Sequence, residues 1–576
     1  MYNTAMRILT RPVLSSGVIA LVIGIPLIAL ASIVAFDPPF AAALPSDLGS
    51  QDFSPSPEFI RMARVVIWFG IRVLFLLLLA VAIYFARPFF AKVRSGDPVY
   101  RRWLFVALTL VGVNAIVLLL MWPGFWVYDE FYVLTDVQEN WLGTWQHIFT
   151  SVYFAVALNL IPTPVGIVIV QFVFGSFVAG YVVARSWSLI PRARLAYLLV
   201  IPFLFFPVLL FNQYPIRVTM MAYIELAVLF RVLVIHLRRD LVTDRYREFF
   251  FLTTAITVAA FWRSEAAFLL VLIPVLAISL RVFRPRRAGV PVRKAVAALI
   301  ATGLVFTGLA GVSAATTSPR YAVTAVYNPL SVMLQGDLGG PNLERNLAAI
   351  DRVVDLDIVQ RDPNIYNIPT FFTKKVLRPD YRAHLTEFEL AYASLVAENP
   401  GAFLHARMQT FLATNAVGRV PVGRTLGGDF LTSGMAQRYI DEFEARNPLG
   451  VPISDEVRLA TVRALLTVSD DAEFTPLTPV VWNVIPAVFL VILSFIVALI
   501  RRRWMFATVF GLLMTQTGIT FATAPANFFM YYWAIYLAGW VLFGFFAIGL
   551  VRRRARQGGA AVADQMPAAT TPAPSR

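Results

Sequence analysis

The sequence predicts an all-α polytopic membrane protein with about twelve transmembrane helices, and three observations lead to that fold class. Hydrophobic residues make up 58% of the 576 positions and the mean hydropathy is +0.70, which is too apolar for a soluble globular domain. The apolar runs are close to the roughly 20 residues that a helix needs to cross a bilayer core of about 30 Å. The arginines gather in short loops between these runs, where they set topology rather than bind nucleic acid.

The predicted crossings follow one another from the N-terminus. We interpret the first as a spanning helix rather than a secretory signal, because it is longer than a typical signal core and lacks a small-residue cleavage site. Run 249–262 is short for a crossing and borrows residues from its flanks. The predicted crossings are 13–36, 65–86, 103–122, 164–185, 195–211, 219–237, 249–262, 266–282, 295–313, 479–500, 504–523 and 528–550.

Basic residues decide the predicted orientation. They lie at the N-terminus, in alternate loops and after the last crossing, and basic loops stay on the cytoplasmic side. Both termini are therefore predicted to be cytoplasmic. Arginine far outnumbers lysine and alanine is abundant, which indicates a bacterial protein of the plasma (inner) membrane. This orientation requires the apolar run 146–161 to remain at the outer face, and the alternative is a real crossing there.

The chain divides into five parts on hydropathy. The long hydrophilic segment before the last three crossings is predicted to be an extracytoplasmic, mainly helical domain, in which two helices meet at Asn399-Pro400 and others cover 342–357 and 454–467. The parts are two N-terminal helices (1–102), a transmembrane core (103–313) with an outer loop at 123–145, the extracytoplasmic domain (314–478), three C-terminal helices (479–550) and a disordered cytoplasmic tail (551–576).

The stretch 122–164 carries the main candidate residues. It opens with a Pro-Gly turn and sets four carboxylates at the outer membrane face, where ionisable groups mark a functional site unless they lie in water. Asp129 is the candidate general base toward an acceptor hydroxyl, or a ligand of a divalent metal, Mg²⁺ or Mn²⁺. Glu130 is the second candidate catalytic residue, with a solvated charge as the alternative. We interpret Asp136 and Glu139 as a solvated face.

Candidate substrate-binding residues lie in other outer loops. Arg217 and Arg263 stand on the face that positive-inside bias depletes of arginine, and a guanidinium binds phosphate oxygens bidentately. They are expected to hold a lipid-linked phosphate, and the alternative is interfacial snorkelling or an ion pair with Glu225 or Glu265. Glu265 and His147 complete the set, His147 as a residue that orients a substrate hydroxyl or as a structural histidine.

Several functional classes lose support. The chain has no cysteine, which excludes disulfides, thiolate metal sites and a cysteine nucleophile. It has no glycine-rich phosphate loop, no nucleotide-binding fingerprint, no His-Glu-x-x-His and no serine nucleophile elbow. If the chain transfers a sugar, the donor is therefore expected to be a membrane lipid.

Several short motifs resemble those of the GT-C superfamily of integral-membrane glycosyltransferases, which use polyprenyl-phosphate sugars as donors. In that family an acidic motif follows a spanning helix in the first outer loop, and a short His/Pro-bearing segment comes next. A bacterial multi-pass branch that the chain also resembles adds a PG-x₄-D turn and an Arg-led turn between helices. The matching residues are Pro123-Gly124, Tyr128-Asp129-Glu130, Trp145-Gln146-His147-Ile148, Ile161-Pro162-Thr163-Pro164, Val183-Ala184-Arg185 and Arg263-Ser264-Glu265.

The resemblance implies a GT-C-like fold and a transferase that moves a sugar from a polyprenyl-phosphate donor to an envelope glycan, lipid or protein on the extracytoplasmic face. It implies that Asp129 serves as base or metal ligand, that Arg263 and Arg217 hold the lipid phosphate, and that 314–478 shapes the acceptor cleft. Where many relatives open the last helix with an Arg-Tyr pair, this chain has Met530-Tyr531.

Two other classes remain open at the level of sequence. A transporter or lipid flippase would show polar or broken helices near the middle of the membrane, and prolines and amides inside several apolar runs are compatible with that. A non-catalytic envelope assembly protein would use the outer domain to bind a partner. Removal of the Asp129 charge separates these alternatives from a transferase.

Overall fold

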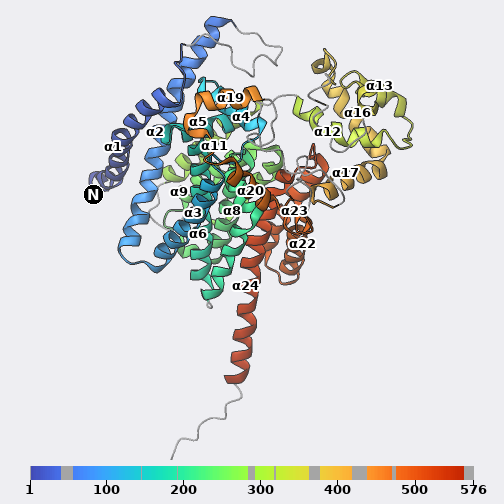
Figure 1. Ribbon diagram of the computed structural model, residues 1–576. Coiled ribbons are helices and arrows are strands. Elements are labelled where there is room, and N and C mark those ends of the chain that lie inside the picture. The colour runs from blue at the N-terminus through green and yellow to red at the C-terminus, as the bar shows by residue number, and fades with distance from the viewer. Residues whose placement is uncertain are drawn as a thin grey trace, which may run out of the picture.

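Helices dominate the computed structural model of the protein (Figure 1). In the ranges that it describes, the sole β feature is an isolated bridge between Val354 and Leu377. The predicted all-α class is therefore confirmed. The structure describes residues 2–40, 56–143, 146–190, 193–282, 292–316, 320–361, 371, 376–417, 437–469 and 475–563.

Nine helices within these ranges are long and apolar enough to cross a membrane, and a tenth crossing results if one bent pair counts as a single span. The chain is thus a multi-pass membrane protein. The nine lie in α1 (Tyr2–Val34), α2 (Pro57–Arg94), α3 (Pro98–Leu120), α6 (Pro164–Leu189), α8 (Arg217–Leu237), α11 (Val292–Thr316), α21–α22 (Thr478–Val481 and Ile485–Ile500), α23 (Trp504–Thr523) and η7–α24 (Phe529–Tyr532 and Trp533–Ala563). The bent pair is η2 (Ala193–Leu204) and α7 (Phe206–Gln213), which meet at 61°.

Two of the predicted crossings, 249–262 and 266–282, form helices. These helices are too short or too polar to count among the nine spans. The helix α9 (Arg245–Trp262) begins with charged residues, and η4 (Ser264–Val271) runs into α10 (Leu272–Ser279) as one of the shorter apolar helices. Length and composition therefore support nine or ten crossings, and a count of twelve stays a prediction.

The apolar run 146–161, which we expected to stay at the outer face, forms α5 (Ile148–Leu160). Its 13 residues extend about 20 Å at roughly 1.5 Å each, well short of a bilayer core of about 30 Å. The preceding helix α4 (Tyr128–Gln138) packs on α5. These two short helices form a hairpin beside the ends of the long ones.

The transmembrane core is packed around α8, which is buried along nearly its whole length against α6, α9, α23 and α24. Two glycines of α6 permit close approaches to neighbouring helices. A Cβ at Gly175 would lie 2.5 Å from the Tyr223 ring of α8, and one at Gly180 would lie 2.6 Å from the Trp103 carbonyl of α3. Small residues at such crossings let helix backbones approach in a membrane, where van der Waals packing drives association.

Buried amides stabilise the end of the bent pair. Gln171 of α6 donates through Nε2 to the carbonyls of Phe211 (2.9 Å) and Tyr214 (2.7 Å). Asn212 donates to Asn114 Oδ1 of α3 at 2.9 Å. Backbone carbonyls freed by a helix break must find partners inside a membrane protein. These contacts therefore fix the position of the chain that leads into α8.

A separate lobe lies outside the core and has its own hydrophobic centre (Figure 1). The predicted break at Asn399-Pro400 is confirmed, because one helix ends at Glu398 and the next begins at Pro400. Buried Arg407 docks the lobe on the core by donating to the carbonyls of Phe521 (2.5 Å) and Ala524 (2.8 Å). The lobe contains α12 (Arg320–Met333), α13 (Leu343–Asp351), α14 (Leu356–Arg361), α16 (Leu385–Glu398) and α17 (Pro400–Thr414).

The later part of the predicted outer domain leaves this lobe and returns to the core. In Figure 1, α19 (Gln437–Arg446) lies over α4 and α5, whereas α20 (Asp455–Leu466) packs against α7 and α3. The predicted helix at 454–467 is confirmed as α20, whose N-cap Ser454 accepts a hydrogen bond from the backbone of Val457 at 3.3 Å. The segment 314–478 thus contributes to two places in the molecule.

The C-terminal helix extends further than expected. We expected 551–576 to be a disordered tail, but α24 continues as a helix to Ala563. Residues 552–557 favour continuation of the helix because they are arginine, alanine and glutamine, which have good helix propensity, whereas the last turns run through Gly558 and Gly559. Residues 564–576 lie outside the described ranges.

Candidate functional site

The chain enters α4 through a turn that only glycine fits. Gly124 has φ +113°, and a Cβ there would lie 2.9 Å from the carbonyl oxygen of Gln213. The next residue, Phe125, donates its backbone N–H to that same carbonyl at 2.8 Å. Buried Arg458 of α20 donates to the Gly124 carbonyl at 2.8 Å. The start of α4 is therefore fastened to the end of α7 and to the returning segment.

The first turn of α4 carries the two predicted catalytic acids, and they occupy different environments. Glu130 is completely buried, and its Oε1 accepts a hydrogen bond from Gln146 Nε2 at 2.7 Å. Burial, reinforced by the neighbouring charge of Asp129, raises the pKa of Glu130 to about 8. Asp129 is partly exposed. Glu130 has no exposed surface in this structure whereas Asp129 does, so Asp129 is the better placed of the two to reach a substrate, and a catalytic role for Glu130 stays a prediction.

Gln146 joins α4 to α8. Its side chain donates to Glu130, while its carbonyl oxygen accepts a hydrogen bond from Arg217 Nη1 at 2.7 Å. Arg217 is the first residue of α8, so the bent pair and its amide contacts determine where this guanidinium lies. Glu130 thereby helps to position Arg217 through one intervening residue.

His147 is buried and neutral. Burial and the charge of Arg217 lower its pKa to about 4. Its Nδ1 accepts from the backbone N–H of Phe149 at 3.3 Å, so Nε2 carries the proton and donates to Ser313 Oγ of α11 at 3.1 Å. Ser313 in turn donates to the carbonyl of Phe261 at 3.4 Å. These contacts tie the link before α5 to α9 and α11, as expected for the structural alternative.

Arg263 and Glu265 form a bidentate ion pair at the turn between α9 and η4. Arg263 Nη2 lies 2.8 Å from Glu265 Oε1, and Nε lies 3.2 Å from Oε2. The side chain of Arg263 is only 5% exposed. Its guanidinium lies 5.7 Å from the ring centroid of Tyr531 in η7. The ion-pair alternative to phosphate binding is therefore realised in this structure.

One electrostatic neighbourhood unites the predicted residues. The Tyr531 phenol is within range of the charges of Arg263, Glu265, Asp129 and Arg217. The charges of Asp129 and Arg217 act on the carboxyl group of Glu130. The charge of Arg217 also acts on the imidazole of His147. All six residues that we predicted from sequence thus lie at one end of the core, although they come from α4, the 146–147 link, α8 and the α9–η4 turn.

Sequence reasoning missed two aromatic members of this neighbourhood. The charges of Glu130 and Asp129 add to burial in raising the pKa of Tyr214 well above its ordinary value. Tyr214 follows α7, and Tyr531 belongs to the run Phe528-Phe529-Met530-Tyr531-Tyr532. Nothing in such an aromatic run distinguishes a tyrosine at a site from one in the core. Trp145 of the family motif lies outside the described residues.

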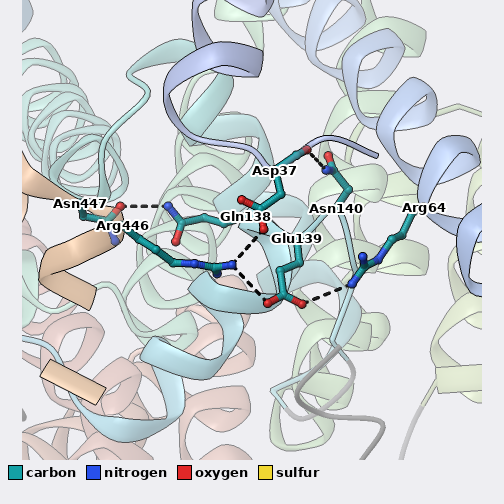
Figure 2. A network of polar contacts seen from close by, with 7 residues as sticks. All are labelled: Asp37, Arg64, Gln138, Glu139, Asn140, Arg446 and Asn447. Atoms are coloured by element: carbon teal, nitrogen blue, oxygen red, sulfur yellow. Dashed lines mark hydrogen bonds and ion pairs between the residues drawn. The ribbon is translucent and has the colours of Figure 1, made fainter. Parts of the chain in front are cut away.

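The C-terminal end of α4 is held by a polar network (Figure 2). We interpreted Asp136 and Glu139 as a solvated face, and this was wrong. Asp136 is 1% exposed, and Glu139 bridges Arg64 of α2 (3.3 Å) and Arg446 of α19 (3.4 Å). Arg446 also pairs with Asp37 at 2.9 Å. The error has a physical source, since the covering groups come from distant segments that local hydropathy does not reveal.

We expect Glu139→Gln to destabilise the protein by about 1–3 kcal/mol, because it removes the charge that two arginines share, one of them almost fully buried. Thermal unfolding of the purified full-length chain in detergent measures this effect. Glu58→Gln, at an exposed glutamate on the same helix as Arg64, is the control and should unfold at the native temperature. Equal unfolding temperatures for native protein and Glu139→Gln would show that the network contributes nothing.

The raised pKa of Glu130 makes stability depend on pH. Between about pH 4.5 and 8 the unfolded chain has lost this proton while the folded chain retains it, so stability falls as pH rises through that window. Glu130→Gln keeps an oxygen for Gln146 and removes the titration, so its unfolding temperature should fall less between pH 5 and 8 than that of the native protein. The exposed Glu389→Gln should follow the native curve, and parallel curves for all three proteins would refute the assignment.

The residues do not make a convincing metal site. The predicted site residues include three acids, Asp129, Glu130 and Glu265. Glu130 is buried with a raised pKa, and both carboxylate oxygens of Glu265 accept hydrogen bonds from Arg263. Within the described part of the chain, no group of three or more His, Asp or Glu side chains is arranged to hold a metal ion. Asp129 alone is a poor donor set for Mg²⁺ or Mn²⁺, which prefer several oxygen ligands.

Comparison of the chain with protein-family models, with curated proteins and with solved structures gave no match.

Proposed function

We propose that the protein is a GT-C-like glycosyltransferase that moves a sugar from a polyprenyl-phosphate donor to an envelope acceptor on the extracytoplasmic face of the bacterial plasma membrane. One observation carries the proposal: a partly exposed aspartate, Asp129, lies at the same end of an apolar core as Arg217 and Arg263, and the charges of all three act on Tyr531. That set combines a base for a hydroxyl with cations for a lipid phosphate.

In the proposed reaction an acceptor hydroxyl attacks the anomeric carbon of the donor sugar. Asp129 takes the hydroxyl proton as the new C–O bond forms. The bond between the anomeric carbon and the phosphate oxygen breaks, and its electron pair leaves with the polyprenyl phosphate. Arginines then stabilise the extra negative charge on that phosphate, without any step that needs a metal.

The surrounding residues have positioning roles in this proposal. Glu130 acts through Gln146 on Arg217, and His147 fixes the same link against α11. Glu265 orients the guanidinium of Arg263 in the absence of donor. When the donor binds, the lipid phosphate replaces Glu265 as the partner of this guanidinium. The outer lobe, docked through Arg407, would shape the side on which the acceptor arrives.

The proposal includes twelve crossings and two cytoplasmic termini. Nine spans and the bent pair make ten, and α9 and η4–α10 would add two more if each crosses the membrane fully. This topology puts the cluster outside and the arginine-rich loops inside, as positive-inside bias requires.

The proposed function is tested by deleting the gene in the source organism and measuring the lipid-linked sugars and envelope glycans of the deletion strain. A transferase predicts loss of one envelope glycan and accumulation of one polyprenyl-phosphate sugar, which the native gene on a plasmid should reverse. If neither lipid-linked sugars nor envelope glycans change, the proposal fails.

A transporter or lipid flippase is the second candidate, because the bent pair and its buried amides resemble the broken helices of transporters. A flippase would leave lipid-linked sugar on the cytoplasmic leaflet when the gene is deleted. A transferase would leave it on the outer leaflet, where an impermeant periodate treatment of intact spheroplasts reaches it. The location of the accumulated lipid thus decides between the two.

A further inference from the structure

An exposed apolar stripe runs along α17, the last helix of the lobe. It consists of Leu404, Met408 and Leu412, which lie four positions apart and therefore follow one another on one side of the helix. Their side chains are 55%, 48% and 36% exposed. An apolar surface of this kind on a polar lobe indicates a partner that covers it.

A polar strip lies beside the apolar stripe on the same exposed side of α17. It consists of His405 and Gln409, each of which follows a residue of the stripe by one position and is turned from it by about 100°. Gln409 Nε2 lies 2.8 Å from His405 Nε2, so the two polar side chains contact each other. An apolar stripe flanked by a polar strip suits a helix at the boundary between hydrocarbon and water.

Two contacts hold α17 at the ends of membrane spans (Figure 1). Buried Arg407 donates to the carbonyls of Phe521 and Ala524, where the α23 span ends. Asn415, the C-cap residue of α17, accepts through Oδ1 from the backbone N–H of Val484 at 2.6 Å, where α22 begins. Since α22 and α23 pack as an antiparallel pair, both contacts are at the same end of the core. This end is where the two spans leave the bilayer.

The apolar stripe continues a surface that faces lipid. Leu477 and Val480, at the start of the span that contains α22, are 59% and 71% exposed. Exposed apolar side chains of a spanning segment contact the bilayer. Leu412 lies three positions before Asn415, which is bonded to the start of the same span, so the stripe begins beside this lipid-facing surface.

The size of the stripe also favours lipid over a second copy of the chain. A stable protein interface uses roughly 20 to 30 residues on each side, whereas the stripe has three side chains on one helix. A bilayer needs no such area, because the spans already hold the protein in the membrane and the stripe only adds to an existing contact.

We propose that α17 is an interfacial helix, with its apolar stripe inserted among the acyl chains of the adjacent leaflet and its polar strip at the level of the headgroups. The bilayer would then support the lobe directly, in addition to the contact that Arg407 makes. The inference does not depend on the proposed transferase activity, because it rests on the exposed side of α17 and on its contacts with α22 and α23.

Spin labels on single cysteines test this position, and the chain has no natural cysteine to replace. Full-length Met408→Cys, Gln409→Cys and Val480→Cys are labelled with a nitroxide in lipid nanodiscs. Collision with oxygen, which concentrates in hydrocarbon, is compared with collision with a nickel chelate, which stays in water. The ratio of the two should be several-fold higher at Met408 than at Gln409 and close to that at Val480. Equal ratios at Met408 and Gln409 would overturn the proposal.

The same label distinguishes lipid from a second copy. Contact between two chains would shield Met408→Cys from oxygen and from nickel, and would broaden its spectrum until unlabelled chain is added. That result would refute insertion into lipid. The three labelled positions are exposed, so the labels leave the packed side of α17 intact.

Lipid quenching measures how deep the stripe lies. A fluorophore on Leu412→Cys should be quenched more by phosphatidylcholine brominated near the headgroup end of its acyl chains than by lipid brominated near the methyl end. The reverse order would place α17 inside the hydrocarbon core, and absence of quenching would place it in water. Either outcome contradicts an interfacial helix.

Discussion

Asp129→Asn is expected to lower the rate of glycosyl transfer by about 10²–10⁴, the range that positioned general bases contribute. The amide keeps the size of the side chain but cannot take the hydroxyl proton as the C–O bond forms. Membranes that contain the variant should therefore fail to transfer sugar from the accumulated polyprenyl-phosphate lipid to the acceptor. Transfer is measured with the lipid isolated from the deletion strain, at equal amounts of native and variant protein.

The control for Asp129 is the same change at an aspartate of a neighbouring helix. Asp441 lies on α19, close to α4, and its side chain is exposed, so Asp441→Asn is the matched variant. It should transfer sugar at the native rate. If Asp129→Asn also transfers sugar at the native rate, Asp129 is not the base. Its carboxylate would then only offset the positive charge of the nearby arginines.

Arg263→Gln should have the largest effect on stability as well as abolishing transfer. It leaves Glu265, whose side chain is 19% exposed, without its bidentate partner, and breaking a largely buried pair costs about 3–5 kcal/mol. Unfolding temperature in detergent reports the stability, and the membrane assay reports the transfer. An unchanged unfolding temperature would contradict the ion-pair geometry.

A double variant separates structural from functional roles of the pair. Arg263→Gln with Glu265→Gln removes both charges together, so stability should return to nearly the native value. Transfer should stay lost, because no guanidinium remains there to hold the lipid phosphate. If transfer returns along with stability, Arg263 is a structural residue and phosphate binding is left to Arg217.

The helices and the break at Asn399-Pro400 could be predicted because both depend on local sequence. Hydropathy over about 20 residues and a proline that no helix interior accepts are properties of a short window. The arginines at 217 and 263 could be chosen because each contradicts the charge bias of an outer loop. Their convergence with Asp129 follows from the topology, since all three were assigned to the same face.

Features that depend on distant partners could not be predicted. The contacts of Glu139 come from α2 and α19, and the end of α7 is held by amides that α3 and α6 supply. Glu130 and Glu139 look alike in sequence, yet one is neutral beneath Gln146 and the other bridges two arginines. Only the packed structure distinguishes such residues.

The network at the end of α4 also determines the order in which its contacts can form while the chain is being synthesised. Arg446 lies 307 positions after Glu139, which it contacts. At about 5–20 residues per second, a ribosome needs roughly 15 to 60 s to make that interval. During this delay the C-terminal end of α4 has its contacts with Arg64 and with the backbone of Asp37 but not the one with Arg446. A chain that stops after the outer lobe would therefore insert its early helices normally and still have an unfinished outer site.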